Sequence, residues 1–333
     1  GMYGYTRVSE DVIESYLRWQ QRRNGWSAAA DWFRFTPGVV TAINLLLLSE
    51  TEEGDEVLIQ RPVYYPFADS IQQQKRTVVN SPLHLKNGRY EIDFEDFEQK
   101  TASPQCKAFI LSNPHNPVGR VYTEEELRRL GEICLKHHVF VIADEIHSDL
   151  IFPGHRHVVF ASLGRDYAEN CAVCHAPSKT FNLAGLSFSC ILIPNQARRE
   201  RFDRMFARYC RAHPNFFAPV AAKAAWDYGE DWLNSCLSYI QKNDQFVREF
   251  AENTWHGDVW ISPLEGTYLQ WIDFRKLEPD PERLRQTMLY QARVAMDEGS
   301  MFGAEGNGFE RLNLAAPRKV IAEIMDRIAA ALR

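Results

Sequence analysis

Short apolar runs alternate with longer segments of helical spacing through the first two thirds of the chain. The helical spacing covers residues 8–20, 39–48, 65–74 and 124–137, and the apolar runs that predict strands cover residues 57–60, 77–79, 108–111, 139–143, 171–174 and 190–193. Residues 139–143 are wholly apolar, which is typical of a parallel strand covered on both faces. Strands that alternate with helices in this way predict an α/β fold with a mostly parallel sheet.

The pattern changes from about residue 214. A long helical stretch, broken near Gly229, is followed by apolar runs at residues 259–261, 268–274 and 310–314 and by helical spacing at residues 282–293 and from Pro317 onward. A chain of 333 residues is longer than one hydrophobic core usually serves, which favours two lobes around a cleft. We expect a large domain at residues 1–225 and a smaller α+β domain at residues 226–333.

Composition and charge exclude several classes of protein. The 38 Lys and Arg residues against 44 Asp and Glu give a formal charge of −6, and the densest basic stretch, residues 198–211, carries aromatic residues at helical spacing, so it predicts an amphipathic helix and not a nucleic-acid surface. The apolar runs are far shorter than the roughly 20 residues that cross a bilayer. We find no secretion signal, and the 7 cysteines are scattered through apolar segments as reduced thiols are, so we expect a cytoplasmic protein.

Polar residues with chemical potential follow several of the predicted strands. Asn116 lies in a loop after the strand at 108–111, Asp144 and His147 follow the strand at 139–143, and Lys179 follows the strand at 171–174. Gly38 precedes the helix at 39–48 and leaves its N-terminus bare. Each feature alone has a structural explanation, such as a turn, a helix cap or a solvated side chain. Ligands of parallel sheets bind beyond the carboxyl ends of the strands, so we expect these groups to meet in one cleft.

The combination favours a ligand that is anionic at one end, basic and planar at the other, and reactive toward an amine. Pyridoxal phosphate has all three properties. Its phosphate suits the helix N-terminus at Val39 and Val40, its ring nitrogen needs a carboxylate such as Asp144, and its aldehyde forms a Schiff base with a lysine such as Lys179. Tyr64, which follows the strand at 57–60, is expected to stack on the ring.

A metal-dependent hydrolase is the alternative from another class of enzyme. His155 and His157 follow Asp144 and His147 closely in the sequence, and the four together imitate a metal-ligand cluster.

Six motifs resemble those of class I/II aminotransferase-fold enzymes, which are pyridoxal-phosphate enzymes of fold type I. The motifs are Gly4-Tyr5-Thr6, Thr36-Pro37-Gly38-Val39-Val40, Asn113-Pro114-His115-Asn116-Pro117-Val118-Gly119, Asp144-Glu145-Ile146-His147-Ser148-Asp149-Leu150, Ala176-Pro177-Ser178-Lys179-Thr180-Phe181-Asn182-Leu183-Ala184-Gly185-Leu186 and Phe309-Glu310-Arg311-Leu312-Asn313. They cover nearly the whole chain in the right order, and more narrowly they resemble the MalY/PatB cystathionine β-lyase subgroup.

The resemblance implies a role for each residue near the cofactor ring. Lys179 would be the Schiff-base lysine and the proton carrier, and Asp144 would pair with the ring nitrogen. Asn116 and His147 would lie near the ring hydroxyl. Tyr64 would stack on the ring and belong, with Lys179 and Asp144, to the catalytic residues.

The phosphate site departs from the wider pattern. Many aminotransferases of this fold have an arginine eight positions after the lysine, where this chain has Ser187. The resemblance therefore leaves the phosphate to the amides after Gly38, to Ser178 and to Tyr5, which would reach across from the neighbouring subunit of a homodimer. Family members usually have several tens of residues before the Gly-Tyr-Thr motif, which implies an incomplete substrate pocket here.

The resemblance also implies the substrate contacts and the reaction. Arg311, with Asn116, would bind the carboxylate of an amino-acid substrate. The subgroup favours carbon–sulfur β-elimination from cystathionine or related cysteine conjugates, giving pyruvate, ammonia and a thiol. An aminotransferase is the alternative, because both reactions begin with removal of the Cα proton.

Overall fold

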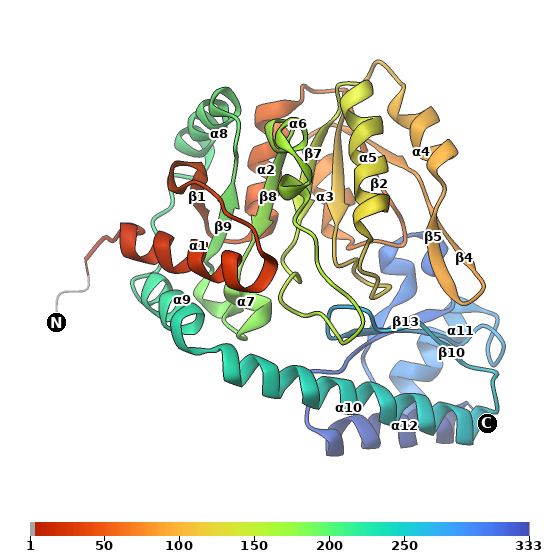
Figure 1. The fold of residues 1–333 in the computed structure, drawn as a ribbon. Helices are drawn as coiled ribbons and strands as arrows, with labels where there is room; N and C mark the ends of the chain where they lie inside the picture. The colour runs from red at the N-terminus through yellow and green to blue at the C-terminus, as the bar shows by residue number, and fades with distance from the viewer. Residues whose placement is uncertain (1–3, 333) are drawn as a thin grey trace.

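The computed structural model describes residues 4–332. Residues 1–3, the start of the N-terminal segment in which the sequence shows no secretion signal, lie outside this range. Within it, a seven-stranded sheet forms the larger domain in the order β1-β9-β8-β7-β6-β2-β3 (Figure 1). Its strands are β1 (Phe33–Thr36), β2 (Glu56–Ile59), β3 (Thr77–Asn80), β6 (Cys106–Ser112), β7 (Phe140–Asp144), β8 (Cys171–His175) and β9 (Ser189–Leu192). β3, β2, β6, β7 and β8 run parallel. β9 pairs antiparallel with β8, and β1 pairs antiparallel with β9, so β9 alone opposes the other six strands and β1 points the same way as the parallel ones. The expectation of a mostly parallel sheet is confirmed.

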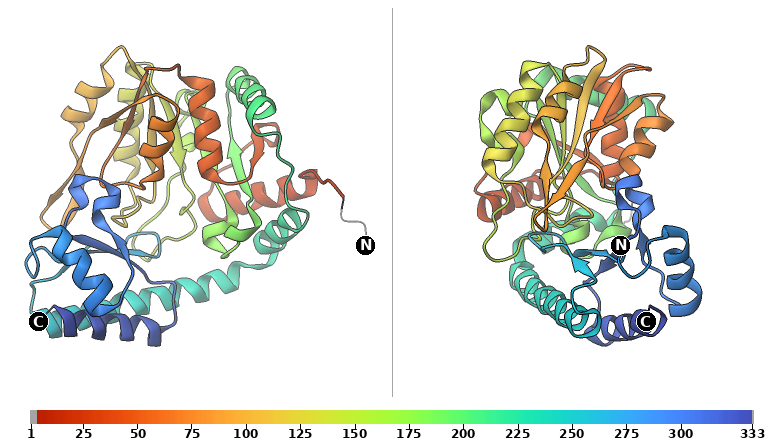
Figure 2. Two further views of the ribbon diagram at one scale, coloured as in Figure 1. Left: turned by 180° about the vertical axis from the view of Figure 1, so that it is seen from behind. Right: turned by 90° about the vertical axis from the view of Figure 1, so that its right-hand side faces the viewer.

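Helices cover both faces of this sheet (Figure 2). α2 (Val39–Glu50), α3 (Pro66–Gln73) and α8 (Gln196–Tyr209) pack on one face, and α1 (Glu10–Asn24), α5 (Glu124–Lys136) and α9 (Phe217–Tyr228) pack on the other. Successive residues of β7 face the two sides of the sheet in turn. Phe140 and Ile142 belong to the hydrophobic core on the side of α2, α3 and α8, and Val141 and Ala143 belong to the core on the side of α1, α5 and α9. This alternation explains the wholly apolar strand, because neither of its faces meets water.

A smaller domain completes the chain. Its antiparallel sheet has the order β10-β11-β13-β12, formed by β10 (Trp260–Ile261), β11 (Leu269–Asp273), β13 (Phe309–Asn313) and β12 (Asp297–Glu298). α10 (Glu230–Trp255) runs along the base of both domains, and α12 (Arg318–Ala331) packs beside it (Figure 1). The helical stretch breaks at Gly229 as expected, and the boundary between residues 225 and 226 stays a prediction.

Several local expectations need correction. The helix expected at residues 8–20 begins at Glu10, because Ser9 is extended, and it ends at Asn24, where Gly25 has a φ of 67°. The helix expected at 282–293 is α11 (Pro281–Gln286) followed by a π-helical turn, Thr287–Ala292. The predictions missed α4 (Phe94–Thr101), α6 (Arg165–Glu169) and the hairpin of β4 (Leu83–Lys86) and β5 (Arg89–Ile92).

Two other predicted helices are confirmed. The helix expected at residues 124–137 is α5, and Thr123 and Glu126 form a capping box at its start. The basic stretch is the amphipathic helix α8. Between residues 4 and 332, no helix combines the length and the apolar character that a membrane span requires.

Candidate active site

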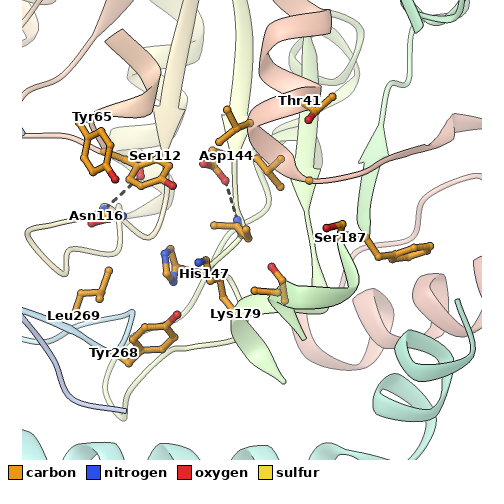
Figure 3. Close-up of a pocket in the computed structure, with 18 of the residues that line it drawn as sticks. Thr41, Tyr65, Ser112, Asn116, Asp144, His147, Lys179, Ser187, Tyr268 and Leu269 are labelled. Carbon is orange, nitrogen blue, oxygen red and sulfur yellow. Dashed lines mark hydrogen bonds between the residues drawn. The ribbon is translucent and has the colours of Figure 1, made fainter. Parts of the chain in front are cut away.

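A cavity of about 420 Å³ opens at the carboxyl edge of the parallel strands, where the small domain faces the large one. The large domain lines it with the start of α2, the ends of β6 and β7, and α7 (Pro177–Thr180). The small domain contributes residues of β11 and β13 and the residue before β11. Figure 3 shows Asn116, Asp144, His147 and Lys179 turned toward a common space. The expected convergence of these side chains is confirmed.

The start of α2 forms an anion-binding cradle. Gly38 has a φ of 135°, which L-residues with a side chain rarely adopt, and its carbonyl accepts the first helical hydrogen bond from the amide of Ala42. The amides of Val39, Val40 and Thr41 therefore have no partner within the helix and lie at the cavity wall. The first turn carries no acidic side chain that would compete with an anion.

Ser189 holds the loop before this cradle in place. Its hydroxyl donates to the carbonyl oxygen of Thr36 at 2.9 Å, lies 2.7 Å from the Thr36 hydroxyl and accepts from the Gly38 amide at 3.2 Å. Ser178 and Ser187 complete this side of the cavity. Ser187, which stands where the wider family pattern has arginine, adopts a left-handed φ of 50° at the end of a short 3₁₀ turn. On this side of the cavity, the described residues therefore provide backbone amides and hydroxyl groups that can bind an anion.

Asp144 is a buried carboxyl group in the cavity with a strongly raised pKa. It ends β7 and accepts a hydrogen bond from the amide of Ile146 at 3.1 Å (Figure 3). Burial raises the pKa of Asp144 to about 7, although the Ile146 amide and the charge of Lys179 act in the opposite direction. The carboxyl group has no cationic partner at ion-pair distance among the described residues. Its chemistry fits a protonated ring nitrogen that arrives with a ligand.

His147 is a neutral imidazole inside the same cavity. Burial, together with the charges of Lys179 and Arg311, lowers the pKa of His147 to about 3. Its Nδ1 atom is buried and has no hydrogen-bond partner within residues 4–332. The ring meets Tyr268 edge to face, with 5.8 Å between the centroids. An unpaired buried nitrogen at the cavity wall fits a ligand that supplies a hydrogen-bonding group.

Arg311 and Asn116 form the polar wall opposite the cradle. The Arg311 Nη1 atom donates to the Asn116 Oδ1 atom at 2.7 Å. The backbone N–H of Asn116 donates to the Ser112 hydroxyl at 3.3 Å. Tyr64 lies next to this pair, because its own amide donates to the Asn116 carbonyl at 3.0 Å. This wall brings together the two residues that were expected to bind a substrate carboxylate.

Tyr64 lies at the cavity as expected. Its ring packs edge to face on Phe67, with 5.7 Å between the centroids, and burial raises its pKa to about 12, so the phenol keeps its proton at neutral pH. The neighbouring Tyr65 and Tyr268 of the small domain also line the cavity, and both were missed. Tyr65 adjoins a predicted site residue, whereas Tyr268 lies at the start of a predicted strand and carries no signal of its own in the sequence.

The metal-ligand alternative is wrong. The His157 Nε2 atom lies 2.9 Å from the Glu145 carboxylate, and the His155 Nδ1 atom lies 3.9 Å from the Glu265 carboxylate. Neither histidine lines the cavity with Asp144. The part of the chain that the structure describes contains no group of three or more His, Cys, Asp or Glu residues arranged to hold a metal ion.

Tyr5 does not line the cavity of its own chain. It is 96% exposed, and its ring lies 5.4 Å from that of His213. All the other residues expected in the site line the cavity, namely Gly38, Val39, Val40, Tyr64, Asn116, Asp144, His147, Ser178, Lys179 and Arg311.

The fold and the cavity together define a pyridoxal-phosphate-dependent enzyme of fold type I. The described residues fit this cofactor, since the chain supplies a lysine, a buried carboxyl group with no cation at ion-pair distance, an unpaired imidazole nitrogen and a helix N-terminus with open amides. Comparison with known proteins agrees. The family model for aminotransferase class I and II matches residues 2–328, and the chain belongs to that family.

Within the family, the chain is similar to carbon–sulfur lyases. It is 40% identical over 332 residues to cystathionine beta-lyase PatB of Bacillus subtilis, an alignment that covers 100% of this chain and 86% of PatB. It is 28% identical to protein MalY of Escherichia coli, covering 100% of this chain and 85% of MalY. The crystal structure of cystalysin from Treponema denticola, which contains pyridoxal 5'-phosphate, matches with a TM-score of 0.98 at 39% identity, covering 100% of this chain and 84% of that chain. The expected resemblance to the MalY/PatB subgroup is confirmed.

Proposed function

We propose that this enzyme is a carbon–sulfur β-lyase that converts cystathionine or a related cysteine conjugate, with water, to pyruvate, ammonia and a thiol. The observation that carries the proposal is the full-length similarity to PatB, at 40% identity. The similarity to cystalysin supports the same reaction class. The cavity fits this chemistry because it combines a lysine, a proton-holding carboxyl group and a carboxylate-binding arginine.

The proposal gives each described residue a task. Pyridoxal phosphate supplies an electron sink next to the substrate Cα. Lys179 would hold the cofactor through its aldehyde carbon and, once free, would take the proton from the substrate Cα. Asp144 would pair with the protonated ring nitrogen, and its buried position would make that ion pair strong.

The substrate is held at its carboxylate. Arg311 and Asn116, which line the same cavity as Lys179, would bind the carboxylate and thereby restrict the orientation of the substrate Cα. His147 and Tyr64 line the same cavity: the imidazole stays neutral and the phenol stays protonated, so both can donate or accept a hydrogen bond without bringing a net charge.

The experiment that tests the reaction measures three products at once. Purified enzyme loaded with pyridoxal phosphate is incubated with L-cystathionine and no 2-oxo acid, and pyruvate, ammonia and free thiol are quantified. We expect equal amounts of the three, and none with a Lys179→Ala variant. Conversion that requires a 2-oxo acid and releases no thiol would refute the lyase proposal and favour an aminotransferase, which the matching family model supports as the second candidate.

We also propose that the working unit is a homodimer in which Tyr5 reaches the phosphate site of the neighbouring subunit. Tyr5 is exposed and lies outside its own cavity, which supports a role outside its own chain. Val220 and Tyr228 of α9 and Trp232 of α10 are 64%, 83% and 51% exposed, an apolar surface that suits a partner subunit.

Mixed dimers test this arrangement. A Tyr5→Phe chain and a Lys179→Ala chain are each impaired as homodimers, and subunit exchange between them is expected to restore one good site, built from the lysine of the first chain and the tyrosine of the second. No recovery after verified exchange, with Tyr5→Phe alone measurably impaired, would place the tyrosine in its own chain's site.

We propose that the enzyme works in the cytoplasm. All 7 cysteines are free, and five of them, Cys106, Cys134, Cys171, Cys174 and Cys190, are buried, as expected of a protein kept in a reducing compartment. Fractionation of the source cells tests this, and enzyme recovered outside the cytoplasmic fraction would contradict it.

A further inference from the structure

Asp297 holds the arginine that faces the substrate. Asp297 of β12 and Arg311 of β13 are direct cross-strand partners, so their side chains share one face of the small sheet. The Asp297 Oδ2 atom lies 2.5 Å from the Arg311 Nη2 atom. Arg311 is 12% exposed and Asp297 is 44% exposed, which places the carboxylate at the outer side of the pair.

The guanidinium group is fixed by two further contacts. Asn116 accepts from the Nη1 atom at 2.7 Å, and the ring of Phe302 lies 4.8 Å from the guanidinium carbon. Within the described chain, side-chain hydrogen bonds occupy two of the five N–H donors of Arg311. Donors remain for one substrate carboxylate, while the nearby charge of Asp297 offsets part of the attraction that Arg311 exerts on it.

The charges around the cavity leave a second substrate carboxylate without a cation. Among the described lining residues the cationic side chains are Lys179 and Arg311. Lys179 is committed to the aldehyde under the proposed function, and Arg311 is shared by Asp297 and the α-carboxylate. His147, the remaining basic group at the wall, is neutral. A second anionic group on the substrate would be repelled by the Asp297 carboxylate behind Arg311, and no further cationic side chain among the described lining residues would attract it.

We infer that Asp297 is a specificity-determining residue: it limits the pocket to amino acids with a single carboxylate near Arg311 and selects against side chains with a further negative charge. The favoured substrates are cysteine conjugates whose sulfur substituent is neutral or zwitterionic, and dicarboxylic amino acids are disfavoured. This inference rests on the proposed function for the choice of cysteine conjugates.

Glu298 offers a matched control. It follows Asp297 in the same strand, and because successive side chains of a strand point to opposite faces, it faces away from Arg311. Its nearest cation is Arg285, with 3.8 Å between the Arg285 Nε atom and the Glu298 Oε2 atom. Glu298→Gln removes the same charge as Asp297→Asn from a neighbouring position without touching the arginine.

The test compares two non-reacting carboxylic acids and two substrates. Inhibition constants are measured for propionate, with one carboxylate, and succinate, with two, and kcat/KM is measured for S-methyl-L-cysteine and S-carboxymethyl-L-cysteine. We expect Asp297→Asn to move both preferences toward the doubly charged compound by about five- to tenfold, the effect of one like charge in a partly exposed site. Glu298→Gln is expected to move neither preference by more than about twofold.

The outcomes separate this inference from the reaction itself. The inference is overturned if Asp297→Asn and Glu298→Gln shift the preferences equally, or if Asp297→Asn shifts neither preference. It is also overturned if Asp297→Asn weakens the binding of both acids equally, because that result means that Asp297 only orients Arg311. Propionate and succinate need no C–S cleavage. If neither cysteine conjugate releases a thiol, the lyase proposal fails while the ratio of the two inhibition constants still decides the role of Asp297.

Discussion

Replacing Asp144 by Asn is expected to stabilise the cofactor-free protein and to damage the loaded enzyme. An Asp carboxyl in an unfolded chain has a pKa near 3.8, whereas burial raises the pKa of Asp144 to about 7 in the folded protein. Between about pH 4 and 7 the folded protein therefore keeps a proton that the unfolded chain has lost. Stability falls as the pH rises through this window and stays low above it. A difference of about 3 between the two pKa values corresponds to about 4 kcal/mol.

Asn is not ionised, and its side-chain oxygen can still accept the Ile146 amide that Asp144 accepts at 3.1 Å. The cofactor-free Asp144→Asn variant is therefore expected to exceed the parent in free energy of unfolding by up to about 4 kcal/mol at pH 8, and the difference is expected to vanish near pH 4. Urea denaturation of both proteins across this range measures it. Asp326→Asn, which removes an exposed carboxylate from α12, serves as the control for a change in net charge.

The loaded enzyme is expected to respond in the opposite direction. Pyridoxal phosphate should stabilise the parent more than the Asp144→Asn variant, because the variant cannot pair with a protonated ring nitrogen, and kcat should fall with little change in KM. Parallel stability curves of parent and variant from pH 4 to pH 8 would refute the argument that Asp144 carries an uncompensated charge. An unchanged kcat would remove Asp144 from its proposed role.

Three further predictions concern the cofactor lysine, the anion cradle and the packing of the large domain. Borohydride reduction of the yellow, loaded enzyme should attach the cofactor to Lys179, as peptide mass analysis shows, and attachment to another lysine would contradict the assignment. Gly38→Ala should weaken binding of pyridoxal phosphate by about tenfold or more in a fluorescence titration. The reason is that a φ of 135° costs a residue with a side chain about 1–3 kcal/mol. An unchanged affinity would mean that the cradle does not hold the phosphate. Gly131→Ala should lower the free energy of unfolding by about 1–3 kcal/mol without changing cofactor affinity, since its Cβ would lie 2.5 Å from the Tyr167 Cδ1 atom and 3.1 Å from the Phe160 Cζ atom; equal stability in urea would show that these rings move aside.

The sequence predicted the part of the site that depends on local chain order. The wholly apolar residues 139–143 predict a strand covered on both faces, which puts Asp144 at its carboxyl end, and the structure ends β7 at Asp144. Lys179 follows β8 in the same way, and Gly38 precedes α2. Parallel strands bring their carboxyl ends to one edge of the sheet. The positions of Asp144, Lys179 and Gly38 along the chain therefore predict that the three residues lie close together, and no long-range contact has to be known.

The parts that escaped prediction depend on register and domain docking. β1 has only four residues and gains its stability by pairing with β9, more than 150 positions later, which no local periodicity reveals. Tyr268 faces His147 only because the small domain docks against the large one. The pair between Asp297 and Arg311 depends on which residues of β12 and β13 stand opposite each other, and a shift of one residue would turn Asp297 away from Arg311.

Asp144 and Arg311 show two ways of holding a charged side chain in one cavity. The two ways differ as the proposed ligands differ, because the cofactor stays bound and the substrate leaves. Burial raises the pKa of Asp144 to about 7, and among the described residues no cation lies at ion-pair distance from its carboxyl group, so the charged form requires a ligand that brings the opposite charge. Such a design is tolerable for a cofactor that stays bound through many turnovers. The substrate carboxylate leaves in every turnover, and Arg311 therefore keeps Asp297 as a counter-ion in the intervals. The cost of that counter-ion is repulsion of any further negative charge, which links the stability of the empty site to the selection of its substrates.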